Sequence, residues 1–403
     1  MQENPHLIHT HNMKAYVVIK EILNVRSSAS DQSDENFVGE LLKGEIVYLK
    51  DEEIIGEVPM GGTSNIWKPD SNNNLVAIEG VRPLNYEEKK RAFIENPDCA
   101  KFIDLSDKTN ESKWKVNWGF VDLEIWKIWK EYKTMGEGIK VAILDSGLNY
   151  DHEDFKNNPN INFYNAVENS ILKKDCLDND STKHGTECAG ILCGQGKIFY
   201  GIAPKASITI IRITDEDANR TTEGILNGLK KAIELEVDVI SLSFFMANDA
   251  NFKLIHEKIK DAYNKNITIC AAAGNSGAST TPVVKFPASF PECFSIGGVT
   301  KSQLRSTASN KSETLCTMAP GEELRSMLLN TKFLKGTSYS TPLIAGIISL
   351  LKSYAKKKNK SFTNNELLNA IKITSDRSME GYDIIDYGYG VIVPKALFNN
   401  LTT

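Results

Sequence analysis

The pattern of hydrophobic and polar positions divides the chain into stretches of different character. Residues 1–13 are expected to form a flexible N-terminus. Residues 14–84 hold short β-branched runs separated by Ser, Asp, Asn and Gly, which is typical of strands joined by turns. Residues 85–117 are charged with little pattern and are expected to be a linker with one short helix at most. In residues 118–400, helical and strand patterns alternate.

This larger region is expected to have an α/β fold. Its clearest unit has apolar runs at residues 208–213 and 237–242, which predict two strands. Between them the pattern predicts a helix with one apolar face, made of Ile225, Leu229, Ala232 and Ile233. Two strands joined by a crossover helix run parallel, so we expect a parallel sheet with helices on both faces.

The composition is that of a folded globular protein. The chain has 403 residues, of which 41% are hydrophobic and 25% are charged. With 47 Lys and Arg against 52 Asp and Glu, the net charge is -5, so there is no basic excess for nucleic acid or anionic lipid. The longest nearly apolar stretch, residues 342–351, is about half as long as a bilayer requires. We therefore expect no nucleic-acid partner and no membrane partner.

The cysteines and the first residues bear on the compartment. The N-terminal residues show no basic stretch followed by an apolar stretch and a cleavage site. The seven cysteines are odd in number, scattered and without a CxxC pair, which favours reduced thiols in a cytoplasmic protein. A mature secreted chain whose leader has been removed would look similar at its N-terminus, so that alternative stays open.

Three short motifs in the α/β region carry candidate catalytic residues. The apolar strand in VAILDSG ends at Asp145, the segment HGTECAGILCG begins with His184, and GTSYSTPLIAGIISLL places Ser338 before an apolar helix. Each residue alone has an ordinary structural explanation, such as a turn-capping carboxylate or a helix N-cap. Together they follow the order Asp, His, Ser, which is one of the known orders of a catalytic triad.

A fourth motif lies between the histidine and the serine. The segment CAAAGNSG places Asn275 after an apolar strand, in a turn bracketed by glycines. Its side-chain amide could donate a hydrogen bond to an oxyanion. Acyl transfer requires a nucleophile, a base, a group that orients the base, and donors aimed at the developing negative charge. The sequence holds all four residue types in order.

These motifs resemble those of the subtilisin-like serine proteases over residues 118–397. The intervals from Asp145 to His184, from there to Asn275, and on to Ser338 are 39, 91 and 63 residues, in agreement with that family. The segments GIAPKASI, DVISLS and YGYGVIVPKAL also match. The resemblance implies a serine endopeptidase that acts on protein or peptide substrates through an acyl-enzyme.

The resemblance also implies a role for each candidate residue. Ser338 would be the nucleophile, His184 the general base and then acid, and Asp145 the group that orients the imidazole. The oxyanion hole would consist of the Asn275 amide and the backbone N–H of Ser338. Substrate binding is expected at Ser241, Leu242, Ser243, Phe244 and Gly274. No cofactor is implied and no metal ligands are assigned. Calcium often stabilises this family, but no loop shows the regular spacing of oxygen ligands, so calcium binding stays open.

Two departures from the family pattern concern substrate choice. The S-L-G-G of the primary pocket becomes Ser-Leu-Ser-Phe at residues 241–244. The larger side chains predict cleavage restricted to small P1 residues or to one dedicated partner, unless Phe244 turns into the core. On the other substrate edge, Asp215, Glu216 and Asp217 replace glycine-rich sequence. They either favour basic substrate residues or form a solvated loop.

Two residues after the histidine also depart from the common pattern. Glu187 replaces the second histidine of HGTH and is expected to affect packing more than chemistry. Cys188 follows His184 by about one helical turn, so the two side chains project from the same face. Cys188 is expected either to be a silent buried thiol or to allow partial inhibition by a bulky thiol reagent.

The N-terminal strands resemble a bacterial SH3-like domain. The strings ILNVRSSAS, GELLKGEIVYL and VAIEGVRPL follow its pattern within residues 14–84. Such a small all-β barrel would bind a protein or peptide ligand, direct substrate choice or restrain the active site. A protease prodomain is the competing interpretation. For the whole chain, the alternatives to an active endopeptidase are a catalytically silent binding protein with the subtilase fold, and a latent enzyme restrained by its N-terminal region.

Overall fold

The chain forms two compact units, Met1–Glu88 and Lys89–Thr403, and each is described by itself. The computed structural model describes the strands between Met13 and Pro83 and residues 85–103, 106–108, 110–246, 251–279, 283–328, 333–379 and 381–402.

In the first unit, the structure describes a set of antiparallel strands. They are β1 (Met13–Val18), β2 (Ile22–Arg26), β3 (Phe37–Leu42), β4 (Ile46–Lys50), β5 (Ile54–Ile55), β6 (Ile66–Pro69), β7 (Leu75–Ala77) and β8 (Val81–Pro83). They pair in the orders β4-β1-β8 and β3-β2-β7-β6-β5. The other residues of this region, including all of the expected flexible N-terminus except Met13, lie outside the described residues. The SH3-like barrel therefore stays a prediction.

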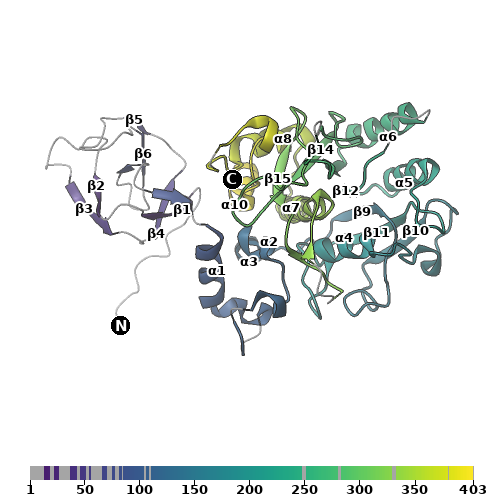
Figure 1. The fold of residues 1–403 in the computed structure, drawn as a ribbon, viewed down its shortest axis with the longest axis horizontal. Helices are drawn as coiled ribbons and strands as arrows, with labels where there is room; N and C mark the ends of the chain where they lie inside the picture. Colours follow the sequence, from purple (N-terminus) through teal and green to yellow (C-terminus); the bar gives the residue numbers. More distant parts are fainter. Residues whose placement is uncertain are drawn as a thin grey trace. The chain divides into compact units, whose positions relative to one another are not determined.

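The second unit is built on a seven-stranded parallel sheet (Figure 1). Its strands are β9 (Lys140–Asp145), β10 (Ile161–Asn165), β11 (Ser207–Arg212), β12 (Val239–Leu242), β13 (Thr268–Ala272), β14 (Cys293–Val299) and β15 (Thr317–Pro320). They stand in the order β10-β11-β9-β12-β13-β14-β15, and all neighbours are parallel. The short strands β16 (Leu324–Arg325) and β17 (Phe333–Leu334) form a separate antiparallel pair. The parallel α/β fold predicted from the alternating pattern is confirmed.

Helices flank this sheet. They are α1 (Tyr86–Glu95), α2 (Trp118–Asp122), α3 (Ile125–Tyr132), α4 (His184–Cys193), α5 (Thr222–Glu234), α6 (Phe252–Asn264), α7 (Thr337–Lys357), α8 (Asn364–Thr374), α9 (Ile384–Tyr387) and α10 (Pro394–Thr402), with 3₁₀ turns at Pro97–Phe102, Glu111–Lys113 and Lys173–Cys176. Helix α5 begins where Thr221 accepts a hydrogen bond from the Gly224 N–H at 2.9 Å. Its buried residues Ile225, Leu229 and Ala232 lie on the predicted apolar face.

Two pairs of packed helices hold the sheet. Helices α5 and α6 pack together and share a hydrophobic cluster with Ala142 and Leu144 of β9. Helices α4 and α7 form the other pair, and α7 also packs on strands β12 to β15. A Cβ atom at Gly346 of α7 would lie 2.6 Å from Cβ of Ile202, so this close approach requires glycine. The start of α7, which carries Ser338, is thus fixed by a buried helix.

Residues 85–117, which we predicted to be a linker, belong mostly to the packed second unit. Phe93, Phe102 and Trp114 are buried. The ring centroids of Phe93 and Trp114 lie 5.4 Å apart, as do those of Phe102 and Phe120. These aromatic residues follow no helical or strand period along the sequence, and charged residues surround them. That irregular spacing concealed their burial from the pattern.

Replacement of Phe93 by alanine is expected to lower the free energy of unfolding of the second unit by about 3–5 kcal/mol. Phe93 is fully buried against three aromatic rings, so the substitution leaves a cavity that the neighbours cannot fill. Urea unfolding followed by tryptophan fluorescence measures the change. The matched control is Arg91→Ala on the exposed side of α1, expected to change it by less than about 0.5 kcal/mol. Equal effects of both variants would contradict a packed role for this segment.

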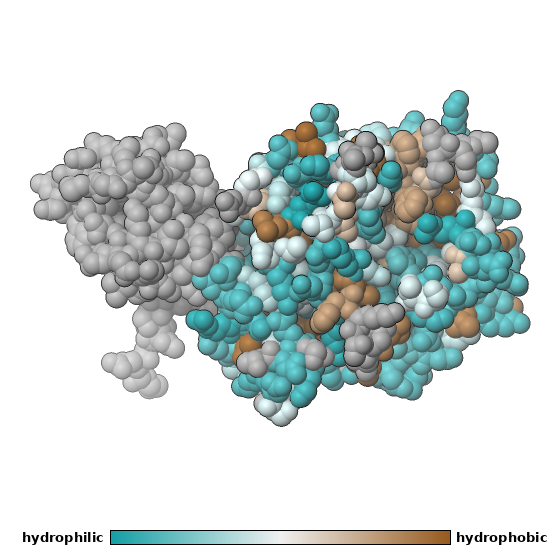
Figure 2. Space-filling model, viewed as in Figure 1, coloured by the Kyte–Doolittle hydropathy of each residue, from teal (hydrophilic) through white to brown (hydrophobic). Residues whose placement is uncertain are grey.

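The surface of the second unit is mostly hydrophilic on the face that Figure 2 shows, with hydrophobic residues in small separate groups. Large exposed hydrophobic side chains are scattered over several elements, among them Ile171, Phe245, Phe333 and Ile373. Scattered exposed apolar residues are normal for globular proteins. Within the described part of the chain, no helix combines the length and apolar character needed to cross a bilayer.

All seven cysteines are buried and none forms a disulfide. They are Cys99, Cys176, Cys188, Cys193, Cys270, Cys293 and Cys316. Burial raises the pKa of each thiol, to about 12 in the case of Cys99 and of Cys316. The thiols are therefore held protonated in the interior.

Candidate active site

The fold brings the three predicted triad residues to the carboxyl edge of the parallel sheet. Asp145 is the last residue of β9, His184 is the first residue of α4, and Ser338 is the second residue of α7. In open parallel sheets this edge is where ligands bind. Residues that are 39 and 154 positions apart along the chain are thus brought to one edge, where a strand ends and two helices begin.

The carboxylate and the imidazole are directly paired. Asp145 Oδ1 lies 2.8 Å from His184 Nδ1 and also accepts the Ser146 N–H at 2.7 Å. A carboxylate at this nitrogen fixes the tautomer in which Nδ1 carries the proton and Nε2 is free to accept one. Asp145 is only 7% exposed, so water screens this pair weakly.

The charge of Asp145 controls the protonation of the histidine. Burial by itself would lower the pKa of the His184 imidazole, but the adjacent Asp145 carboxylate outweighs it and raises the pKa well above 6.5. The histidine is consequently a stronger base than a free imidazole.

This shift predicts the acid limb of the pH profile. Below its raised pKa, His184 is cationic and cannot accept the serine proton, so kcat/KM is expected to fall with an apparent pKa above about 6.5. The measurement is kcat/KM against pH with a peptide substrate that has no ionisable side chain. An acid limb centred below about 6.5 would contradict the predicted influence of Asp145.

The candidate nucleophile, Ser338, is hydrogen-bonded to Ser243, the residue directly after β12. The Ser338 hydroxyl donates to the Ser243 carbonyl at 3.2 Å, and the Ser243 hydroxyl donates to the Ser338 carbonyl at 2.8 Å. Ser338 is 9% exposed at the positive end of α7, where its backbone N–H has no partner within the helix. The hydroxyl and the N–H are thus both presented at one edge of the sheet.

The amide of Asn275 is oriented by the residue that precedes Ser338. Asn275 Oδ1 accepts the Thr337 N–H at 2.8 Å and the Thr337 hydroxyl at 3.0 Å, which leaves Nδ2 as a donor. A Cβ atom at Gly336, where φ is +142°, would lie 2.9 Å from Nδ2, so there is no room for a larger residue. A donor held in this way beside a nucleophile is suited to bind an oxyanion.

A buried carboxylate that the sequence motifs did not single out supports the pair. Asp178 is fully buried and accepts hydrogen bonds from the Thr186 N–H at 2.9 Å, the Thr186 hydroxyl at 2.6 Å and the Ser146 hydroxyl at 2.9 Å. It therefore connects the end of β9 with the first turn of α4. Its signal in the sequence is an Asp six residues before His184, which alone indicates only a turn.

The family model described as the subtilase family matches residues 136–391, more than half of the chain. The chain belongs to the subtilase family. The major intracellular serine protease of Bacillus subtilis (strain 168) is 33% identical over 229 residues, which cover 55% of this chain and 70% of that protein. This subtilase is a serine endopeptidase, as the order and spacing of its motifs predicted.

Two further relatives have similar coverage. An intracellular serine protease of Paenibacillus polymyxa is 29% identical over 274 residues, 64% of this chain and 81% of that protein. Subtilisin E of Bacillus subtilis (strain 168) is 29% identical over 266 residues, 65% of this chain and 66% of that protein. The residues that the family model matches, 136–391, all lie in the second unit.

The residues expected to bind substrate in this subtilase lie at the ends of β12 and β13 and just beyond them. Ser241, Leu242 and Ser243 are buried at the end of β12, and Gly274 comes directly before Asn275. Phe244 is 4% exposed and packs in the hydrophobic cluster beneath the sheet, which is the arrangement that leaves the pocket unchanged. The Ser243 hydroxyl points to the Ser338 carbonyl. Phe244 thus turns into the core, which is the second of the two interpretations that we considered for it.

The acidic loop on the other expected substrate edge, Asp215 to Asp217, has the features of a solvated turn. Glu216 and Asp217 are exposed, and Asp215 Oδ1 accepts the backbone N–H groups of Asp217 at 3.0 Å and of Asn219 at 2.9 Å. Arg212, which is 7% exposed, donates to the Asp215 carbonyl at 2.7 Å. The backbone of this loop is thus firmly held while its outer carboxylates face water.

Glu187 turns away from the reacting groups, whereas Cys188 lies beside them and donates a hydrogen bond to the Ser338 carbonyl at 3.4 Å. Glu187 is buried and accepts hydrogen bonds from the Ser326 hydroxyl and from the Met327 N–H at 3.0 Å, so it joins α4 to the segment directly after β16. The Cys188 Sγ lies 3.9 Å from His184 Nδ1 and is fully buried. Burial raises the pKa of its thiol, which favours the silent form over a reactive one.

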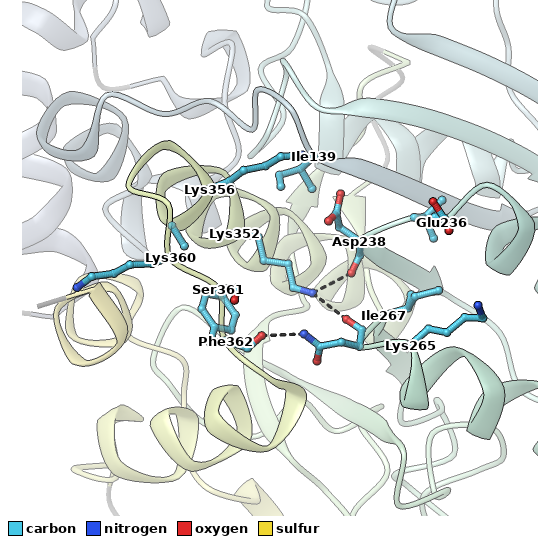
Figure 3. Close-up of a pocket in the computed structure, with 13 residues that line it drawn as sticks. Ile139, Glu236, Asp238, Lys265, Ile267, Lys352, Lys356, Lys360, Ser361 and Phe362 are labelled. Carbon is cyan, nitrogen blue, oxygen red and sulfur yellow. Dashed lines mark hydrogen bonds between the residues drawn. The ribbon is translucent and has the colours of Figure 1, made fainter.

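A pocket of about 440 Å³ lies at the opposite edge of the sheet (Figure 3). Its lining includes Ile139, Asp238 and Ile267, which stand immediately before β9, β12 and β13. Lys352 of α7 donates to the backbone carbonyls of Asp238 at 3.0 Å and Asn266 at 3.3 Å. Burial lowers the pKa of Lys352 to about 8. These bonds attach α7 to the amino ends of the strands, far from the triad.

Proposed function

We propose that this subtilase hydrolyses peptide bonds with Ser338 as nucleophile, His184 as general base and acid, and Asp145 as the residue that orients His184. The observation that carries the proposal is the 2.8 Å contact between Asp145 and His184 at the sheet edge where α7 presents Ser338. The oriented amide of Asn275 supplies the remaining group that acyl transfer needs.

Acylation begins when the Ser338 hydroxyl turns from the Ser243 carbonyl toward His184. Ser338 Oγ attacks the carbonyl carbon of the substrate while its proton passes to His184 Nε2. The negative charge that develops on the substrate oxygen is bound by Asn275 Nδ2 and the Ser338 N–H. The imidazolium that forms is stabilised by the carboxylate of Asp145.

Breakdown of the intermediate uses the same residues in reverse roles. The C–N bond breaks as His184 donates its proton from Nε2 to the leaving amine, and the acyl group stays on Ser338 as an ester. A water molecule then attacks the ester, with its proton taken by His184, and releases the acid and free Ser338. Every group involved belongs to the chain, the substrate or water, so this mechanism requires no cofactor.

We also propose that the enzyme acts inside the cell on a restricted set of protein or peptide substrates, and that residues 14–84 form an SH3-like module that binds a protein or peptide ligand. The unpaired, buried cysteines and two relatives named as intracellular support the location. The antiparallel pairing of β2 with β3 and β7 supports a small all-β module.

Labelling with a fluorophosphonate tests the proposed nucleophile without a known substrate. The full chain is expected to form one covalent adduct, which mass mapping of a digest places on Ser338 rather than on Ser340 or Tyr339. Absence of an adduct on the folded chain would contradict the proposal and favour a silent binding protein. Labelling that appears only after proteolytic removal of the first unit would instead identify a latent enzyme.

A further inference from the structure

Lys285 lies between the two segments proposed to bind the substrate. Its backbone N–H donates to the Ala273 carbonyl at 3.0 Å, just before Gly274. The next residue, Phe286, accepts the Met246 N–H at 2.8 Å and pairs with it in an antiparallel bridge. The backbone around Lys285 thus joins the segment after β13 to the segment after β12.

The side chain of Lys285 runs along Gly274. A Cβ atom at Gly274 would lie 2.5 Å from Nδ2 of Asn310 and 3.0 Å from Cγ of Lys285, so the asparagine amide and the lysine stem together occupy the space that a side chain there would need. Gly274 has φ of +104°, a conformation that other residues rarely adopt. A glycine at this position therefore lets the lysine approach the strand end that carries Asn275.

The ammonium group of Lys285 has no partner among the residues that the structure describes. Its side chain is partly buried, and the ion pairs and hydrogen bonds described for the second unit include none to its Nζ. Lys352, by contrast, is bonded to two backbone carbonyls. A partly buried cation that lacks a partner is suited to pair with an incoming anion.

The proposed oxyanion donors fix which substrate side chain meets this cation. Asn275 Nδ2 and the Ser338 N–H would bind the carbonyl oxygen of the P1 residue, which is the residue after which the substrate is cleaved. The P1 side chain is attached to the Cα atom that is bonded to this carbonyl carbon. It would therefore lie close to the oxyanion donors, beside the segments that hold Ser243 and Gly274. The flexible four-carbon stem of Lys285 can bring its ammonium to a carboxylate placed there.

We propose that Lys285 determines the primary specificity of this subtilase and that the enzyme cleaves after acidic residues, Glu or Asp. The proposal rests on the proposed function, because it requires Ser338 to be the nucleophile and Asn275 an oxyanion donor. It gives the restricted cleavage a chemical basis different from a narrow pocket. A P1 carboxylate pairs with a cation that has no partner among the described residues, whereas a P1 lysine or arginine is repelled.

A set of peptides that differ only at P1 tests the proposal in the full chain. The wild-type enzyme is expected to show kcat/KM about 5- to 15-fold higher for P1 Glu than for P1 Gln, which is the advantage of a charge-assisted hydrogen bond over a neutral one. Lys285→Gln is expected to remove this preference, and Lys285→Glu to reverse it in favour of P1 Lys. A reversed preference cannot come from misfolding. The matched control Lys260→Gln removes one charge from the exposed side of α6 and is expected to keep the wild-type preference.

Fluorophosphonate labelling separates failure of this proposal from failure of the proposed function, because the probe has no P1 side chain. Labelled wild-type enzyme that cleaves P1 Glu and P1 Gln peptides equally well would overturn the role of Lys285 and leave the triad in place. An unchanged preference in Lys285→Gln would overturn it as well. If Ser338 is not labelled at all, the proposed function fails first.

Discussion

Replacement of Ser338 by alanine is expected to lower kcat about a million-fold and to abolish fluorophosphonate labelling. The variant lacks the oxygen that forms the acyl-enzyme, so His184 has no proton to accept and the two-step route is closed. What activity remains comes from the oxyanion donors and from substrate binding, which the change leaves in place. Active-site titration and single-turnover cleavage of a peptide substrate measure the loss.

The matched control for this variant is Ser349→Ala on the same helix. Ser349 is buried in α7, where its hydroxyl donates to the Ala345 carbonyl at 2.7 Å within the helix, away from the triad. It is expected to leave kcat within about twofold of the wild-type value, since substitutions away from the reacting groups act on stability instead. A Ser338→Ala enzyme that still forms an acyl intermediate would assign the nucleophile to another residue.

Replacement of Asp145 by asparagine is expected to lower kcat/KM about ten-thousand-fold with little change in fold. The Asp145 carboxylate accepts the Nδ1 proton of His184 at 2.8 Å, whereas an asparagine can turn its NH₂ toward that nitrogen. The imidazole then carries its proton on Nε2 and cannot accept one from Ser338. Loss of the negative charge also removes the main cause of the raised His184 pKa, so the remaining acid limb is expected to move to lower pH.

Kinetics and NMR of the imidazole protons check this second prediction together. The control Asp151→Asn removes an exposed carboxylate and is expected to change kcat/KM by less than about twofold. A loss of less than tenfold in Asp145→Asn, or an acid limb that stays in place, would show that Asp145 does not control His184. The two readouts distinguish an orienting carboxylate from a merely structural one.

The sequence could predict the triad positions because each lies at a point where the chain changes element. An apolar strand that stops at Asp145, and helices that start at His184 and Ser338, require the three residues to meet at one edge of a parallel sheet. The order and spacing then limited the chemistry to acyl transfer. The parallel sheet followed from the strand and helix alternation for the same reason, since crossover helices leave few other arrangements.

Lys285 and Asp178 could not be predicted in this way, because their importance depends on contacts between segments with no shared pattern. Lys285 lies in a segment that none of the motifs covers, and its approach to Gly274 depends on a tertiary contact. Asp178 has the appearance of a turn residue until Thr186 and Ser146 are seen to donate to it. Phe93 was missed for a related reason: its burial depends on aromatic residues spaced irregularly along the chain.

The burial of all seven native thiols makes the molecule suitable for site-specific fluorescence work. Maleimide dyes react with thiolates, and the raised pKa values of the buried cysteines leave almost no thiolate at neutral pH. One cysteine introduced on the surface of each unit would therefore be labelled far faster than the native ones. Energy transfer between such a dye pair could follow the distance between the two units during turnover in an enzyme that keeps every original residue of its core.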